Sequence, residues 1–180
     1  MFQTNKPSRP IAVAGETEKS GTRHFRLVAQ ATFSPGEEIW MLAGEVVDVP
    51  DRYSVQVGKN DHLRPQPALP QGAEDIYLWR YLNHSCNPNT RIVGRKLLAL
   101  AAIAAGDELT FDYNCTEYEM ATPFPCRCGW CAGATVRGFK YLSAEERAQR
   151  RGSAAPYLWQ LLAEEDDALD NVERHEFVSV

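Results

Sequence analysis

The sequence has no long hydrophobic run near its start and no excess of basic residues. Residues 1–15 contain no apolar stretch able to serve as a signal peptide or to cross a membrane. The formal net charge is −5, from 19 Lys and Arg against 24 Asp and Glu, whereas nucleic-acid binding usually requires a basic face. We therefore expect a soluble cytoplasmic protein without a membrane partner and without direct nucleic-acid binding.

Length and composition are those of an ordinary globular chain. The 180 residues are 44% hydrophobic and 24% charged, which suits one domain with a real core and a terminal appendage. The sequence holds five cysteines. In a chain that is not exported, cysteines are more often reduced or metal-bound than paired in disulfides.

Three motifs follow one another along the chain. The first, RYLNHSCNPN at residues 80–89, gathers side chains that hold turns and bind ligands but pack poorly as plain core. The second is GDELTFDY at residues 106–113, and the third is CRCGWC at residues 126–131. In this order the motifs resemble the SET-domain protein lysine methyltransferases with a post-SET zinc tail, over residues from about 21 to 140.

The resemblance implies a mainly β architecture, the β-clip-like SET fold of short strands. In that family the segments that match residues 83–89 and 108–113 are threaded together in a pseudoknot. The expected organisation is a flexible N-terminal arm at 1–20, a SET domain at 21–114, a cysteine-rich post-SET zinc-binding segment at 115–140, and a C-terminal helical extension at 141–180.

Local patterns predict individual elements. Strands are expected at 24–31, 38–42, 46–49, 53–57 and 108–113, the last with Leu109, Phe111 and Tyr113 on one face. Residues 97–103 have helical propensity, and the family resemblance favours a strand. Ser143 begins a capped helix. Residues 156–170 form an acidic amphipathic helix, with Leu158, Leu161, Leu162 and Leu169 towards the body of the protein.

The activity implied is methyl transfer from S-adenosylmethionine to lysine. The amine must be neutral to attack, although free lysine has a pKa of about 10.4, so the site needs an apolar channel that lowers this pKa. The resemblance assigns Tyr113 as the catalytic tyrosine that orients the amine. It assigns Phe111 to the position where phenylalanine or tyrosine tunes the number of methyl groups, and phenylalanine predicts di- or trimethyl-lysine products.

The cofactor contacts implied by the resemblance are Asn83 and His84, together with Phe25 and Arg26. The latter two lie in the tripeptide His24-Phe25-Arg26, where the family has Gly-x-Gly. Leu42 stands where many members have a tyrosine that lines the lysine channel. These two departures leave an alternative open, a catalytically silent SET-fold module that binds peptides or partner proteins.

A structural zinc site is the last expectation. The tail supplies Cys126, Cys128 and Cys131, and the resemblance supplies Cys86 as the fourth thiolate of a tetrahedral site. Cys115 is left as a free thiol. The expected partner is a protein or peptide that carries a lysine, a histone-like or other basic tail. The location would then be nuclear or chromatin-associated if the chain is eukaryotic or is delivered to a host.

Overall fold

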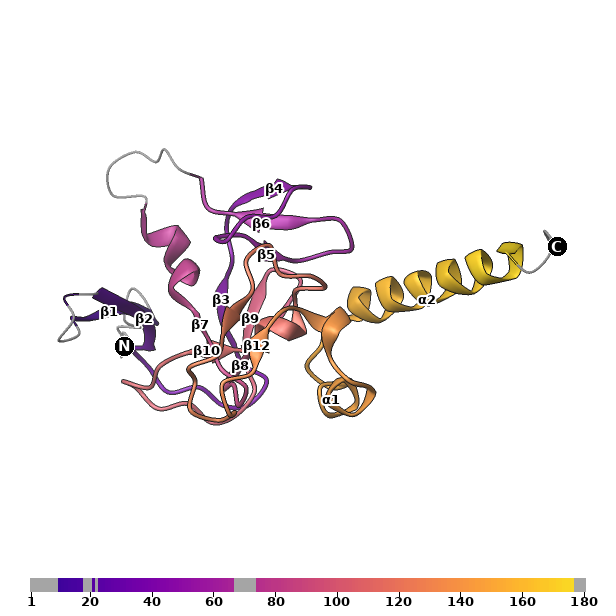
Figure 1. Ribbon diagram of the computed structural model, residues 1–180. Coiled ribbons are helices and arrows are strands. Elements are labelled where there is room, and N and C mark those ends of the chain that lie inside the picture. The colour runs from indigo at the N-terminus through magenta and orange to yellow at the C-terminus, as the bar shows by residue number, and fades with distance from the viewer. Residues whose placement is uncertain (1–9, 18–20, 22, 67–73, 177–180) are drawn as a thin grey trace, which may run out of the picture.

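Short strands in small sheets make up most of the protein. The computed structural model describes residues 10–17, 21, 23–66 and 74–176 (Figure 1). Two antiparallel sheets have two strands each: β1 (Ile11–Thr17) pairs with β2 (Arg23–Ala29), and β11 (Phe124–Pro125) pairs with β12 (Thr135–Val136). Two others have three strands each. Their orders are β3 (Glu38–Met41), β9 (Lys96–Ala99), β8 (Thr90–Val93), and β4 (Glu45–Val47), β6 (His62–Arg64), β5 (Val55–Gln56). The expected mainly β fold class is confirmed.

Strand β1 lies inside the segment expected to be a flexible arm. It pairs with β2 along its whole length, from Ile11 opposite Ala29 to Thr17 opposite Arg23. Ile11 is buried and packs into the core. The expectation of a loose arm is therefore wrong for residues 11–17. The sequence there shows no hydrophobic periodicity, but the buried side chain of Ile11 anchors the strand. Residues 1–9 lie outside the described part of the chain.

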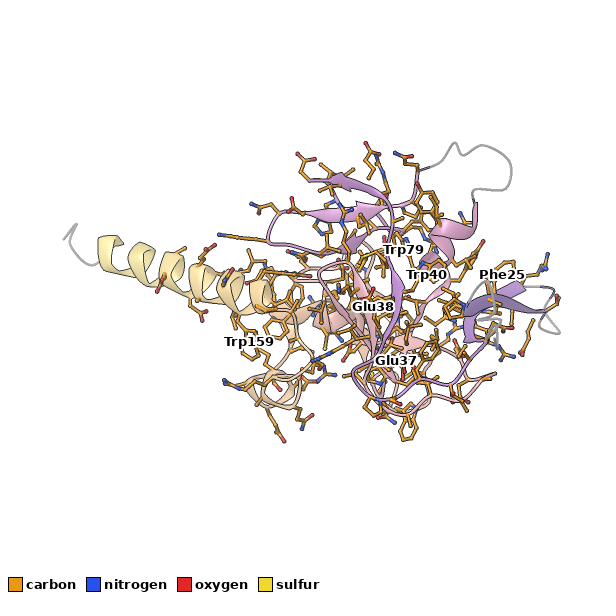
Figure 2. The ribbon with its side chains drawn as sticks, turned by 180° about the vertical axis from the view of Figure 1, so that it is seen from behind. Phe25, Glu37, Glu38, Trp40, Trp79 and Trp159 are labelled. Carbon is orange, nitrogen blue, oxygen red and sulfur yellow. The ribbon has the colours of Figure 1, made fainter. Side chains whose placement is uncertain are left out.

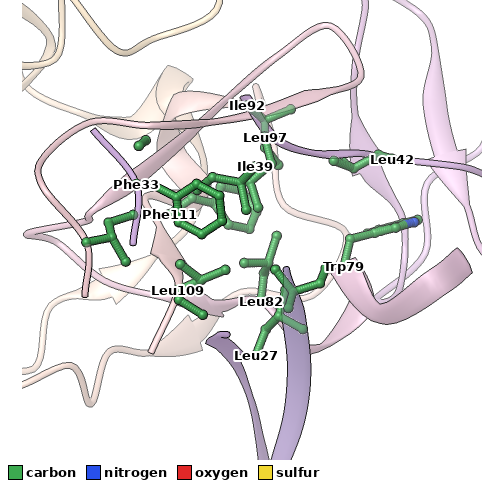
Figure 3. Packing of buried hydrophobic residues seen from close by; sticks show 14 of the residues in the cluster. Leu27, Phe33, Ile39, Leu42, Trp79, Leu82, Ile92, Leu97, Leu109 and Phe111 are labelled. Atoms are coloured by element: carbon green, nitrogen blue, oxygen red, sulfur yellow. The ribbon is translucent and has the colours of Figure 1, made fainter. Parts of the chain in front are cut away.

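One hydrophobic core connects the sheets. Figure 3 shows Leu27, Leu97, Leu109 and Phe111 from three different strand regions packed around a common centre. Leu42 is 1% exposed and belongs to this core. It lines neither of the two cavities described below, so its side chain contributes to the core and not to their walls.

The segments around residues 83–89 and 108–111 lie side by side, as expected. Strand β7 (Asn83–His84) pairs in parallel with β10 (Thr110–Phe111). The Asn89 amide donates to the Glu108 carbonyl at 2.8 Å and accepts from the Thr110 N–H at 2.9 Å. The side chain of Asn89 thus adds two hydrogen bonds between these segments to those of the short β7–β10 pairing.

The strand predicted over residues 108–113 is shorter than expected. It ends at Phe111, because the Asp112 carboxylate accepts from the Asn114 N–H and caps the 3₁₀ helix η2 (Tyr113–Cys115). Tyr113 therefore does not share a strand face with Phe111. The strand expected at 97–103 is present as β9, which ends at Ala99.

Two helices follow at the C-terminal end. Helix α1 (Ala144–Gln149) begins at Ser143 with the expected capping box, in which Ser143 and Glu146 exchange hydrogen bonds. Helix α2 (Pro156–Glu176) projects away from the strands (Figure 1). Its Leu158 is buried against Phe139 in a second small core, and the side chain of Leu169 lies outside the described residues. No helix in the described ranges is long and apolar enough to span a bilayer.

A 3₁₀ helix, η1 (Glu74–Tyr81), leads from the β4–β6–β5 sheet to β7, and η3 (Phe139–Tyr141) precedes α1. The Trp79 indole on η1 donates to the Ala43 carbonyl at 2.8 Å, while Leu82 just after it is buried in the core. This anchoring fixes where β7 begins. It therefore also fixes the position of Asn83 and His84.

Candidate active site

Two cavities meet at Tyr113 and Phe124. We call the first the aromatic cavity; it measures about 290 Å³ and is lined by residues 51–55, Trp79, Arg80, Leu82, Ile92, Phe111, Tyr113, Glu117, residues 120–122 and Phe124. We call the second the polar cleft; it measures about 930 Å³ and is lined by His24, Arg52, residues 83–85, Asn87, Asn89, Glu108, Thr110, Tyr113, Phe124, Pro125, Arg127, Cys128 and Trp130. Arg52, Tyr113 and Phe124 line both. Two aromatic side chains and one arginine therefore stand where the two cavities adjoin.

Tyr113 is held rigidly at this wall. Its hydroxyl donates to the Leu82 carbonyl at 2.7 Å, and its ring lies 4.6 Å from that of Phe111 and 5.8 Å from that of Phe124. Burial, followed by the nearby carboxyls of Glu117 and Glu108, raises the pKa of the phenol well above its ordinary value. The hydroxyl therefore stays protonated near neutral pH.

Asn83 and His84, both expected at the cofactor, line the polar cleft from β7. The Asn83 amide donates to the Phe25 carbonyl at 3.0 Å and to Glu108 Oε1 at 2.8 Å. Glu108 is a cleft residue that the sequence did not single out. It stands inside the second motif, and its meeting with Asn83 depends on contacts across 25 residues.

The other two expected cofactor residues lie differently. Phe25 is 39% exposed and packs against the ring of Tyr81 at 5.4 Å; Figure 2 shows it at the opposite end of the molecule from Trp159. Its carbonyl borders the cleft through Asn83, but its side chain does not line the cleft. Arg26 pairs with Glu16 of β1 at 2.6 Å and lines neither cavity.

Four of the five cysteines converge beside the polar cleft. The sulfur atoms of Cys86 and Cys126 lie 3.9 Å apart, and potential ligand atoms of Cys86, Cys126, Cys128 and His84 all lie within 4.8 Å of one another. Cys131 joins them, since hydrogen bonds from Cys126 and Cys86 help to lower the pKa of its thiol. Cys115 lies apart, buried, with its sulfur 3.5 Å from the Ser153 hydroxyl.

The donor set fits a zinc ion. Burial alone would raise the pKa of Cys128, but the backbone N–H groups of Cys86 and Trp130 outweigh it and lower that pKa to about 6. Burial raises the pKa of Cys86 and, to about 11, that of Cys126. Zinc binding would release the protons that these neighbouring thiols carry. Zinc prefers a tetrahedral site made of thiolates.

His84 and Cys131 are rivals for the fourth ligand position. The Tyr113 N–H donates to His84 Nδ1 at 3.2 Å, and burial lowers the pKa of this histidine, although Asp112 opposes the shift. A neutral ring that accepts at Nδ1 carries its proton on Nε2, which faces Cys86 Sγ at 3.3 Å. Nε2 then has no lone pair for a metal, which favours Cys131 as the fourth ligand.

Three further charged or titratable residues lie near the two cavities. Arg80 is exposed and stacks on Tyr81, whereas Asp112 is buried and ion-paired with Arg150. His62 is buried, with its Nε2 3.9 Å from Glu117 Oε2. Glu117 itself, which lines the aromatic cavity, carries no local sequence signal.

Curated relatives include two proteins named "Histone-lysine N-methyltransferase, H3 lysine-36 specific". The one from Chaetomium globosum is 33% identical over 130 residues, covering 63% of this chain and 14% of that protein. The one from Candida albicans is 32% identical over 144 residues, covering 71% and 16%. The chain thus spans less than a fifth of the length of these two relatives.

Solved structures of similar shape include KRYPTONITE in complex with mCHG DNA and SAH, at TM-score 0.47 and 18% identity over 69% of this chain and 29% of that one. The methyltransferase domain of human SETMAR reaches TM-score 0.45 and 20% identity, over 65% and 54%. A sequence model of the SET domain matches residues 25–114, which are 90 of the 180 residues. The chain belongs to the SET-domain family.

Proposed function

We propose that the protein is a lysine N-methyltransferase that uses S-adenosylmethionine and acts on a lysine in a histone-like or other basic protein tail. The observation that carries the proposal is the position of Tyr113, which lines both the aromatic cavity and the polar cleft. Methyl transfer needs two reactants that approach from opposite sides of one narrow opening. The names of the curated relatives support the histone as the substrate class.

The polar cleft suits the cofactor. It combines the Asn83 amide and the Glu108 carboxylate with the aromatic rings of Phe124 and Trp130, groups that recognise a nucleoside through hydrogen bonds and stacking. When bound there, S-adenosylmethionine supplies an electrophilic methyl group on a sulfonium. The expected backbone and side-chain roles of Asn83 and His84 are part of this proposal.

The aromatic cavity suits the lysine. The rings of Trp79, Phe111, Tyr113 and Phe124 supply apolar parts of its walls, and an apolar setting favours the neutral amine that must react. The Tyr113 hydroxyl is already aimed by its bond to the Leu82 carbonyl. It stands within a ring of aromatic side chains that restricts how the amine can turn.

The division of the chain is part of the same proposal. We infer that residues 21–114 form the SET domain, 115–140 the post-SET zinc segment, and 141–180 a helical extension, with β1 added to the catalytic body. The net charge of −5 supports a basic peptide rather than nucleic acid as the direct partner. A histone substrate would imply a nuclear or chromatin location.

Isothermal titration calorimetry with S-adenosylmethionine tests the proposal. We expect saturable binding by the parent chain and roughly tenfold weaker binding by Asn83→Ala, because a buried polar contact to a ligand is lost. Asn60→Ala is the matched control, since Asn60 is exposed and lines neither cavity. The alternative is a catalytically silent peptide- or partner-binding module, which the absence of glycine from His24-Phe25-Arg26 favours. Absence of cofactor binding by the parent chain would establish that alternative.

A further inference from the structure

Glu117 is a buried acidic side chain in an aromatic setting. It is 6% exposed, and it lines the aromatic cavity together with Phe111, Tyr113 and Phe124. Asp51, Arg52 and Arg80 line the same cavity but are more exposed. Glu117 is therefore the charged group that stands at the enclosed part of this space, whereas the other three stand where solvent reaches them.

The carboxyl of Glu117 is fixed in place from one side. Its Oε1 accepts from the Gln56 N–H at 2.8 Å and from the Thr116 hydroxyl at 3.4 Å. Its Oε2 lies 3.9 Å from His62 Nε2, which is too far for a hydrogen bond. Burial lowers the pKa of His62, with Asp61 opposing the shift, so the imidazole is neutral near pH 7 and adds no positive charge.

A buried carboxylate is costly unless a cation compensates it. Among the residues that the structure describes, no lysine or arginine lies within ion-pair distance of Glu117. The cavity that Glu117 lines is also bordered by the aromatic rings of Phe111, Tyr113 and Phe124, and the faces of such rings attract cations. An acidic group and several aromatic faces around one cavity are complementary to an alkylammonium ion.

We propose that Glu117 is the positioning residue that recognises the positive charge of the substrate's lysine side chain as it enters the aromatic cavity. This inference rests on the proposed function, because it takes the lysine to be the occupant of that cavity. Glu117 would draw the ammonium group into the cavity and align its chain with Tyr113. This role belongs to binding, and it ends before the amine loses its proton and reacts. The specificity that follows is for a long side chain with a charged end over an uncharged one of the same length.

The recognition should depend on pH in one direction. Burial is the main cause that raises the pKa of Glu117 to about 7, with the hydrogen bonds from Gln56 and Thr116 opposing it. The groups that face it from neighbouring elements are His62 of β6, Tyr113 of η2 and Tyr157 of α2. Burial lowers the pKa of His62 and raises those of both tyrosines, so all three are neutral near pH 7. Charge recognition therefore strengthens as Glu117 ionises.

The test measures binding and catalysis separately, by fluorescence polarisation and by methyl transfer. The probes are two degenerate peptide pools that differ only in a fixed central residue, lysine in one and its uncharged counterpart norleucine in the other. Binding is measured with S-adenosylhomocysteine present. We expect the parent chain to bind the lysine pool with about tenfold or higher affinity than the norleucine pool, because a hydrogen bond to a charged group contributes about that much. Glu117→Gln should lose this preference.

Two further variants separate charge from structure. Glu117→Asp keeps the carboxylate and should retain part of the preference. Glu119→Gln changes an exposed glutamate two residues along the same segment, paired with Lys140, and should retain all of it. Glutamine at position 117 can still accept from the Gln56 N–H, so circular dichroism of Glu117→Gln should match that of the parent.

The outcomes are distinguishable. A lysine preference that survives in Glu117→Gln would overturn the inference, and methyl transfer by the parent chain would then leave the proposed function standing. A preference that needs Glu117, in a parent chain that transfers no methyl group, would overturn only the proposed function. Should Glu117→Gln fail to fold, the parent chain alone decides, since a preference that stays constant between about pH 6 and pH 8 contradicts a role for this carboxylate.

Discussion

Arg150, just after helix α1, donates a hydrogen bond from Nε to Asp112 Oδ2 at 2.7 Å. Asp112 is 4% exposed and directly precedes Tyr113, and its other carboxylate oxygen accepts from the Asn114 N–H. The C-terminal extension is thus tied to the residue that caps the helix η2 on which Tyr113 sits. An element that looks like an appendage in the sequence supports the candidate site from behind.

Replacing Arg150 with methionine should destabilise the fold. The Asp112 carboxylate would then stay buried without its cation. Removing one partner of a buried ion pair lowers the free energy of unfolding by about 3 kcal/mol. Urea unfolding measures this loss. Arg151→Met is the control, because Arg151 is exposed and only stacks on Trp159. Equal unfolding free energies of the two variants would mean that the Arg150–Asp112 pair does not stabilise the fold.

Tyr113→Phe should abolish methyl transfer while the protein stays folded and binds its cofactor. Only the hydroxyl is removed, and its loss leaves one carbonyl, that of Leu82, without its 2.7 Å donor. The cost in stability should be about 1 kcal/mol. Radiometric transfer assays and thermal unfolding give the two quantities. Turnover near the parent rate would show that this hydroxyl does not orient the amine.

The metal prediction is one zinc ion per chain, held by Cys86, Cys126, Cys128 and Cys131. Cys131→Ser should lose the metal in elemental analysis of protein purified without chelator, because zinc needs the thiolate. Cys115→Ser should keep it, since Cys115 lies by Ser153 and away from the cluster. Chelation should loosen the tail without unfolding the core. A zinc content unchanged in Cys131→Ser would point to His84 as the fourth ligand instead.

Phe111 should influence how many methyl groups are added. It lines the aromatic cavity, and its ring lies 4.6 Å from that of Tyr113. Phenylalanine offers no hydroxyl to anchor a water molecule, so a methylated amine displaces that water more easily. We expect di- or trimethyl-lysine from the parent chain and a shift towards monomethyl-lysine in Phe111→Tyr. Mass spectrometry after long reactions measures the product, and a parent chain that stops at one methyl group would contradict this role.

Glu117→Gln should change how stability depends on pH. The folded protein raises the pKa of Glu117 to about 7 from an ordinary value of 4.5. Folding therefore takes up a proton between these values, and stability falls as the pH rises through this range. Above pH 7, where the carboxyl is ionised, the free energy of unfolding is lower than at acidic pH by on the order of 3 kcal/mol.

The variant lacks this cost. It should match the parent near about pH 5 and exceed the parent's unfolding free energy near about pH 8, by up to that amount. Urea unfolding at both pH values measures the difference, with Glu119→Gln as the exposed control. A variant less stable than the parent at both pH values would show that the carboxylate is structural. Substrate recognition would then not explain its burial.

The sequence by itself determined the features that depend on residues close together. The motifs at 80–89, 106–113 and 126–131 indicated the family, and a family model confirmed it. The capping box of Ser143 and Glu146 was readable because its two residues lie three positions apart. The cysteine spacing indicated a metal site for the same reason, and the structure brings Cys86 to the tail cysteines as the family resemblance implied.

Only the tertiary structure decided the features made by distant residues. Glu117 meets Gln56 across 61 positions, Asn83 meets Glu108 across 25, and Arg150 meets Asp112 across 38. Contacts of this kind leave no periodic pattern, because each depends on how separate short strands pack against one another. The same holds for β1, which has a partner only because β2 folds back beside it. The aromatic cavity, and the buried carboxyl inside it, exist only once those strands have met.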